Sequence, residues 1–280
     1  MQRYLLTRGD DFGSFSEANH AIRDAFNRGI LRSASLMAPT PAYQEAAGFA
    51  RAMPGLCLGL HLTLNCEWDQ VRWGPVSDPA LVPSLVDGDG NFLSEPLLIH
   101  QRGVVLAEAM RELRAQLARA RADGLTISYL DDHMGFSWIH PAGNQPRLLQ
   151  AIRAWAHEEG LIFHTDVTRA DVPSLLKDLP HPYDPAVVAE RIARIEPGIA
   201  FLHTHPAYHR GTLPTLRPRG GPDAAIGKEA AIRAADAAIL LDPTIRSACD
   251  RHGVTLVSYV EASRALADLG REARATARGS

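Results

Sequence analysis

Apolar and polar residues alternate in blocks along the chain, and the blocks predict strands and helices in regular alternation. Short apolar runs predict buried strands at residues 5–9, 33–37, 56–64, 126–130, 161–163, 199–202 and 254–259. Helical spacing and capping residues predict helices at residues 17–28, 43–52, 106–123, 145–159, 184–195, 228–240 and 243–251. This alternation is typical of an α/β fold with a parallel sheet, and its length suits a single barrel or an open sheet.

Two long segments rich in proline and glycine interrupt the regular pattern, at residues 65–96 and 206–222. Irregular segments of this length are usually functional loops, so we expect both near a binding site. Ser16 is the expected N-cap of the first helix, and Gly29 is its expected C-cap. Residues 1–270 are expected to form one domain, and residues 271–280 a polar C-terminal tail.

Composition narrows the classes of protein that the chain can belong to. The 280 residues are 46% hydrophobic and carry a formal net charge of -3, which permits a large core but does not indicate nucleic acid or a membrane surface as partner. Cys57, Cys66 and Cys249 have no metal-type spacing, and an odd number of cysteines favours reduced thiols. With no apolar signal core or transmembrane run, we expect a cytoplasmic protein.

Four of the predicted strands run into residues capable of metal or acid–base chemistry. In a parallel (β/α) barrel, the C-terminal ends of the strands share one face, where active sites lie. One carboxylate with two imidazoles leaves open positions on a divalent ion, as catalytic metal sites require. The residues that end these strands are Asp10 and Asp11, His61, Asp131 to His133, and His203 with His205.

Each of these residues also has a purely structural interpretation. Asp10 and Asp11 are common turn formers, and His61 in an apolar strand is more often a hydrogen-bonded core histidine than a ligand. His203 and His205 are also consistent with a solvated loop. Because such residues occur at the ends of four different strands, a functional site is favoured over four separate structural roles.

The sequence resembles the YdjC/ChbG family of carbohydrate deacetylases over essentially its full length. The ordered set of motifs carries the resemblance, because each motif alone is unspecific. The matching segments are Asp10-Asp11-Phe12-Gly13 with Asn19, residues 59–64 around His61, Leu130-Asp131-Asp132-His133, His205-Pro206, and the closing residues 253–259.

This resemblance implies an irregular, single-domain (β/α) barrel with long loops at the C-terminal face of the strands. It implies hydrolysis of N-acetyl groups on an amino sugar or acetylated oligosaccharide with one divalent metal ion, Mg²⁺ or Zn²⁺, and is consistent with a homodimer. Carried over by position, the metal ligands are Asp11, His61 and His133, the general base is Asp10 and the general acid is His205. Phe12, Asn19 and Asp131 are the expected substrate-binding residues.

Three positions depart from the family pattern. Met134-Gly135-Phe136 stands where relatives continue with further histidines, Phe201 where an acidic residue often lies, and His164 where arginine is frequent. These changes leave the acetylated sugar unidentified. Two other functions stay open: a non-catalytic sugar- or metal-binding protein on the same scaffold, and a metal-dependent phosphoesterase.

Overall fold

The computed structural model describes residues 2–138 and 147–278, and within them a single parallel sheet forms the centre of the molecule. The strand order is β5-β4-β3-β2-β1-β6, with β7 also paired to β1, and all these pairings are parallel. The strands are β1 (Arg3–Phe12), β2 (Ser33–Leu36), β3 (Cys57–Leu62), β4 (Tyr129–Asp132), β5 (Ile162–Phe163), β6 (Gly198–Thr204) and β7 (Val254–Val257).

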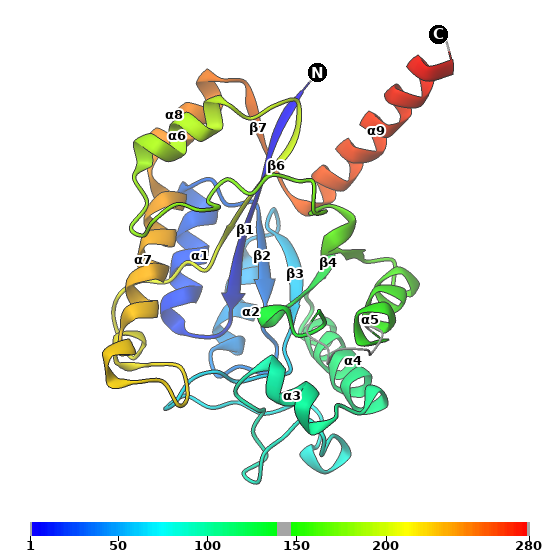
Figure 1. Cartoon of the computed structure of the whole chain (residues 1–280), viewed down its shortest axis with the longest axis vertical. Coiled ribbons are helices and arrows are strands. Elements are labelled where there is room, and N and C mark those ends of the chain that lie inside the picture. The colour runs from blue at the N-terminus through cyan, green and yellow to red at the C-terminus, as the bar shows by residue number, and fades with distance from the viewer. Residues whose placement is uncertain (1, 139–146, 279–280) are drawn as a thin grey trace.

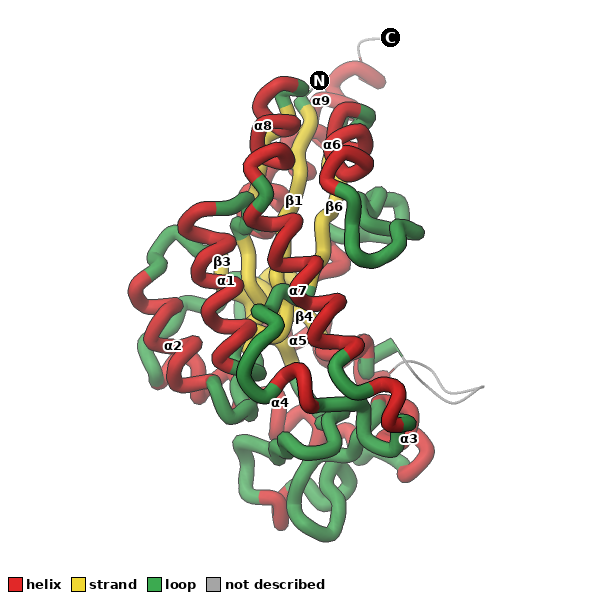
Figure 2. Tube along the Cα trace, turned by 90° about the vertical axis from the view of Figure 1, so that its left-hand side faces the viewer, coloured by secondary structure: helices red, strands yellow, loops and turns green. Residues whose placement is uncertain are grey.

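Helices surround the sheet, and the irregular segments gather beyond the C-terminal ends of the strands (Figures 1 and 2). Between β3 and β4 the chain forms a long loop with α3, at the lower end of the molecule in Figure 1. The helices are α1 (Ser16–Arg28), α2 (Tyr43–Ala52), α3 (Pro96–Arg102), α4 (Leu106–Ala122), α5 (Arg147–Glu158), α6 (Pro185–Ala193), α7 (Lys228–Leu241), α8 (Pro243–Arg251) and α9 (Tyr259–Arg278).

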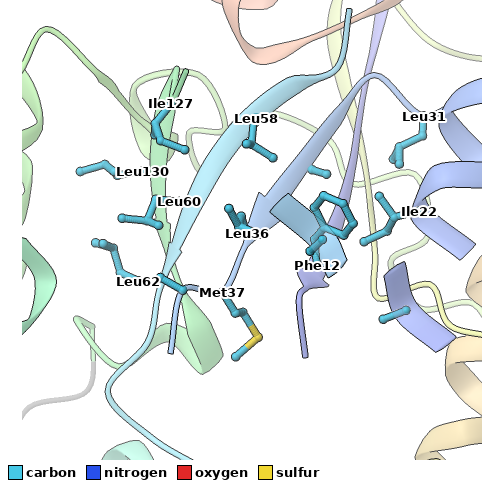
Figure 3. Packing of buried hydrophobic residues seen from close by; sticks show 14 of the residues in the cluster. Phe12, Ile22, Leu31, Leu36, Met37, Leu58, Leu60, Leu62, Ile127 and Leu130 are labelled. Carbon is cyan, nitrogen blue, oxygen red and sulfur yellow. The ribbon is translucent and has the colours of Figure 1, made fainter. Parts of the chain in front are cut away.

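The sheet is curled, with a large apolar core on its outer side and a small one inside. The outer core packs strand residues such as Leu36 and Leu60 against helix residues such as Ile22 (Figure 3). The inner core contains Tyr129 and Tyr259, whose rings stack with centroids 4.1 Å apart. Beyond β6, backbone hydrogen bonds join residues 173 and 175 to residue 201 and lengthen that side of the sheet. The predicted α/β barrel architecture is thereby confirmed.

Strand β1 is central, because β6 pairs with most of its length, β7 with its first half and β2 with its second half. Its pairing with β2 is irregular between Gly9 and Phe12, where Asp11 has a φ of 63°. Aspartate tolerates this left-handed conformation better than most residues, and such strain is common at functional sites. The irregularity turns Asp10 and Asp11 toward different neighbours.

Gly29 ends α1 as predicted, for a steric reason. A Cβ atom on this residue would lie 2.2 Å from the backbone oxygen of Leu240 in α7, so only glycine permits the close approach of the two segments. The predicted N-cap at Ser16 is wrong. Phe15 occupies that position without a side-chain cap, and the Ser16 hydroxyl contacts Glu45 instead.

Two helices were not expected from the sequence. The first is α3, at the end of the expected loop over residues 65–96, and the second is α9. The last strand ends at Val257 instead of residue 259, and α9 runs through the start of the expected tail at residue 271 as far as Arg278. Of the helix expected at 145–159, residues 145 and 146 lie outside the described part. None of the described helices is long and apolar enough to cross a membrane.

Candidate metal and acid–base site

Three side chains that are distant in sequence converge at the C-terminal ends of β1, β3 and β4. Oδ1 of Asp11 lies 3.4 Å from Nε2 of His61 and 3.3 Å from Nδ1 of His133. The two imidazole nitrogens are 3.3 Å apart, and all three side chains are buried. The arrangement expected from the sequence for Asp11, His61 and His133 is therefore present, with one atom of each residue within 4.8 Å of the others.

A carboxylate lies behind each of the two imidazoles. Oε2 of Glu67 is 3.0 Å from Nε2 of His133, and Oδ1 of Asp131 is 3.2 Å from Nδ1 of His61. The Ser35 hydroxyl donates to the other oxygen of Asp131 and fixes its orientation. Outer carboxylates of this kind orient histidine ligands and raise their basicity. Both ring nitrogens that face Asp11 are thus held in a defined direction.

Helix α7 supplies a residue that sequence reasoning missed. NH1 of Arg233 lies 2.6 Å from Oδ2 of Asp11, which leaves Oδ1 to face the two histidines. The guanidinium also lies over the ring of Trp68. Burial works against the charged form of Asp11, but Arg233 and the histidines outweigh it and hold the pKa of this carboxyl well below its usual range.

The charges of the cluster fit a divalent cation. Four carboxylates face only two guanidinium groups, so the other two negative charges are balanced only when His61 and His133 are protonated, and a divalent cation can replace those two protons. Oδ1 of Asp11 accepts no hydrogen bond from the described residues. Burial lowers the pKa of both histidines, yet the surrounding carboxylates raise the pKa of His61 well above normal and that of His133 to about 9. The charged residues of the cluster are Asp10, Asp11, Glu67, Asp131, Arg8 and Arg233.

Asp10 belongs to a separate set of contacts. Arg8, two residues earlier in β1, lies with Nε 2.8 Å from Oδ1 of Asp10 and NH2 2.8 Å from Oδ2. Nε2 of His203 in β6 lies 2.7 Å from Oδ2. Burial raises the pKa of Asp10, but Arg8 and His203 lower it by a larger amount. The pKa of Asp10 therefore lies well below its usual value. The carboxylate of Asp10 is therefore ionised at neutral pH.

Phe201, one of the departures from the family pattern, is part of the support for Asp10. Its ring is parallel to that of His203 within 5°, and the guanidinium of Arg8 lies 5.2 Å from its centroid. Arg8 also donates to the hydroxyl of Tyr259. An apolar ring at position 201 thus orients the two groups that contact Asp10.

His205 lies next to this set. Its ring centroid is 4.7 Å from that of His203, and its backbone N–H donates to Asp236 of α7. Burial, together with the positive environment of His203, lowers the pKa of His205 to about 3. The imidazole of His205 is therefore neutral in the free protein at neutral pH.

Comparison with known proteins agrees with this arrangement. The profile of the YdjC-like protein family matches residues 4–251, which is most of the chain. The chain belongs to the YdjC-like family. A carbohydrate deacetylase of Geobacillus stearothermophilus is 31% identical over 270 residues, which cover 93% of this chain and 98% of the relative. The family expected from the sequence is thus confirmed.

Solved structures share the fold of this YdjC-like protein at low sequence identity. A protein of Enterococcus faecalis V583, named for cellobiose-phosphate cleavage, aligns with a TM-score of 0.70 at 23% identity, covering 93% of this chain and 99% of the other. The peptidoglycan deacetylase PdaC of Bacillus subtilis aligns with a TM-score of 0.51 at 13% identity, covering 99% and 97%. At these identities the likeness concerns the fold alone.

The YdjC-like chain uses two of the expected substrate-binding residues in structural contacts. Phe12 is buried in the core. Oδ1 of Asn19 accepts from the backbone N–H of Gly13, and its amide donates to Ala42 and Glu45, which fixes the turn after β1. Asp131, the third, contacts His61 as described above. A role for these residues in substrate binding stays a prediction.

The remaining departures follow β4 and its neighbour β5. Met134 and Gly135 have left-handed backbone conformations with φ of 54° and 63°, and they turn the chain directly after His133. Nε2 of His164 lies 3.4 Å from Oδ1 of Asp132, whose other oxygen accepts hydrogen bonds from Ser137. His164 therefore contacts Asp132 and supports this turn.

A cavity of about 480 Å³ opens onto the cluster. Its lining includes Asp11, His133 and His205, so two of the proposed metal ligands and the proposed general acid border the same space. Cavities of this size accommodate a single small ligand. The other lining residues are Glu67, Trp68, Glu95, Pro96, Leu97, Met134, Pro218, Glu229, Ile232 and Arg233.

Proposed function

We propose that this protein is a metal-dependent hydrolase that removes N-acetyl groups from an amino sugar or an acetylated oligosaccharide. The observation that carries the proposal is the convergence of Asp11, His61 and His133 beside the cavity, which Asp11 and His133 line. Family membership and the deacetylase name of the Geobacillus relative support the same reaction.

Asp11, His61 and His133 would hold the ion through the three atoms that face one another. Two imidazoles with one carboxylate resemble the donor sets of hydrolytic zinc enzymes, so we expect Zn²⁺ to be preferred to Mg²⁺. When bound there, a divalent cation polarises the acetyl carbonyl and lowers the pKa of a water molecule. Glu67 and Asp131 keep the two imidazoles in the required orientation.

Asp10 is the general base in this proposal. Its carboxylate is ionised and is held by Arg8 and His203, so it is ready to accept a proton when water attacks the acetyl carbon. Asp10 and Asp11 do not occur in the same candidate ligand group among the described residues, which supports separate roles for the two.

His205 is the general acid, and it needs a proton during turnover because it is neutral at rest. His203 lies between Asp10 and His205, with its Nε2 2.7 Å from Asp10. When His203 carries a proton on both ring nitrogens, Nδ1 can release one toward His205 while Nε2–H stays hydrogen-bonded to Asp10. The proton that Asp10 takes from water then keeps the net charge of the Asp10–His203 pair unchanged. His205 then protonates the departing amine as the C–N bond breaks, and acetate and the free amino sugar leave.

Acetate release from N-acetylated mono- and oligosaccharides tests the proposal. The protein is stripped with a chelator and reloaded with Zn²⁺ or Mg²⁺, and acetate and free amine are quantified for each substrate. We expect equal amounts of both products and loss of activity after stripping. Specific sugar and metal binding without turnover on any substrate would instead indicate a non-catalytic binding protein.

A further inference from the structure

The cavity above the candidate metal site is strongly acidic. Four carboxylates line it, from Asp11, Glu67, Glu95 and Glu229, but only one guanidinium, that of Arg233. Arg233 is already paired with Asp11 and is therefore not free to bind an anionic ligand. Even a bound divalent cation would leave the lining with one negative charge in excess.

Two of these carboxylates are not used by the metal or acid–base groups. Glu95 precedes α3 at the N-cap position, but its side chain makes no cap hydrogen bond and is exposed. Glu229 lies in the first turn of α7, one helical turn before Arg233. Within the described part of the chain, neither side chain accepts a hydrogen bond, although Glu229 interacts electrostatically with Arg233. Both are available to a ligand that occupies the cavity.

The same cavity contains Oδ1 of Asp11, which is buried and has no hydrogen-bond donor among the described residues. The reacting end of a ligand is therefore expected beside Asp11. Glu95 and Glu229 come from the long loop after β3 and from α7, and they line the same cavity from different parts of the chain. Glu229 is half-buried, so water screens its charge less than that of Glu95, which is exposed.

We propose that the substrate is a small N-acetylated amino sugar that already carries a second, free amine. This inference rests on the proposed deacetylase function and specifies its substrate. The protonated amine pairs with Glu95 and Glu229 while the acetamido group reaches the metal-side cluster. Apolar lining residues, among them Leu97, Met134 and Ile232, contact the C–H faces of the sugar. A phosphorylated sugar is disfavoured, because its dianion would meet these carboxylates without a free guanidinium.

Matched substrates test the charge preference directly. The set contains glucosamine disaccharides with one acetyl group and one free amine in either order, the doubly acetylated neutral disaccharide, and its phosphorylated form. Measurements are made with the metal-loaded protein below about pH 7, where an amine is protonated. We expect a kcat/KM about 3- to 10-fold higher for a cationic than for the neutral disaccharide, a range typical of one or two partly exposed ion pairs. The phosphorylated form is expected to be the poorest, and added salt should reduce the preference.

Variants assign the preference to particular residues. In the double variant Glu95→Gln and Glu229→Gln, the ratio of kcat/KM for cationic and neutral substrates should fall to about one, whereas Asp89→Asn, in the same loop but outside the cavity, should keep the wild-type ratio. Equal kcat/KM values for the neutral and both cationic substrates in the wild type would overturn the inference, as would preference for the phosphorylated form.

Direct measurements of sugar binding test the charge preference independently of the proposed reaction. If no substrate releases acetate, the proposed reaction is wrong, but calorimetric titration with glucosamine, N-acetylglucosamine and its 6-phosphate still measures charge preference. Tighter binding of the amine, lost in the double glutamine variant, would support the cation site. Binding that is equal for all three sugars, or tightest for the phosphate, would refute it.

Discussion

Nε2 of His203 lies 2.7 Å from Oδ2 of Asp10, and the pairing of β6 with β1 sets this contact by placing His203 directly opposite Arg8. Only 2% of the Asp10 side chain is exposed, against 34% of that of His203. The imidazole is therefore the connection between a buried carboxylate and the outer part of the site. No family motif indicated this residue, yet it touches both proposed acid–base groups.

Replacement of His203 by Gln or Phe should lower kcat about 10- to 100-fold, at the lower end of the range for assisted proton transfer. KM and metal affinity should change little, because His203 is not a proposed metal ligand and does not line the cavity. Steady-state kinetics and metal titration check both points, with the exposed loop residue His209→Gln as control. If Gln restores full activity, His203 serves only as a hydrogen-bond donor and carries no proton.

The neighbouring aspartates should respond differently to the same change. Asp10→Asn should keep metal affinity nearly intact and reduce turnover by about 10²–10⁴, the usual contribution of a general base. Asp11→Asn should weaken metal binding, with part of the activity returning at high metal concentration. Calorimetric metal titration paired with acetate release distinguishes the two. Loss of the metal in Asp10→Asn and its retention in Asp11→Asn would reverse the assigned roles.

Glu67→Gln should reduce metal affinity about 10- to 100-fold, the typical effect of removing a carboxylate behind a histidine ligand. The physical reason is that Glu67 lies 3.0 Å from Nε2 of His133 and increases the basicity of the opposite nitrogen. Competition with a chromophoric chelator measures the change. Asp89→Asn, an exposed change in the same loop, provides the control, and equal affinities for the two variants would contradict the role of Glu67.

Metal binding should strengthen as the pH rises toward about 9. The pKa of His133 is raised to about 9 in the metal-free protein, so binding below that pH must displace its proton. Each released proton changes affinity by up to about tenfold per pH unit. In the chelator-treated protein, folding stability depends on pH in the opposite direction. Protonated His133 stabilises the fold at pH 6.5 and below, and this contribution is lost as the pH rises through about 9. Calorimetry in buffers of different ionisation enthalpy counts the released protons, and pH-independent affinity would contradict the assignment.

Gly29→Ala should destabilise the protein by about 1–3 kcal/mol, the usual cost of overpacking. The added Cβ would lie 2.2 Å from the backbone oxygen of Leu240, which cannot move without shifting α7. Gly48→Ala is a matched control, because only the end of the Arg51 side chain lies near its Cβ and alanine favours helix α2. Denaturant unfolding of both variants gives the comparison, and equal loss of stability in the two would refute the steric explanation.

The sequence predicted those features that depend on local pattern or on the common direction of parallel strands. Apolar runs located the strands, and Asp11, His61 and His133 meet because they lie at or next to the C-terminal ends of parallel strands, which share one face. The contact of Arg233 with Asp11 could not be predicted, because the sequence of a helix does not show whether one of its arginines points into the molecule. The contact of Glu67 depends on the path of a loop that has no periodicity.

The two unexpected helices have similar explanations. Pro96 lies at the end of the expected loop, but proline also occupies the first turn of helices, as it does in α3. Tyr259 ends an apolar run in the sequence, but its ring packs on Tyr129 inside the barrel and its backbone begins α9. Whether residues 1–270 form one independent domain stays a prediction.

Strand β1 pairs with three other strands, and this has a consequence for the order in which the sheet assembles during synthesis. The first 133 residues contain all three proposed metal ligands, whereas β6 and β7, which complete the pairing of β1, are made only later. A nascent chain can therefore bring the three proposed metal ligands together before His203 and His205 have been synthesised. Parallel pairings between distant segments form slowly, so binding of the ion during translation would guide the open edge of β1 to its last partners.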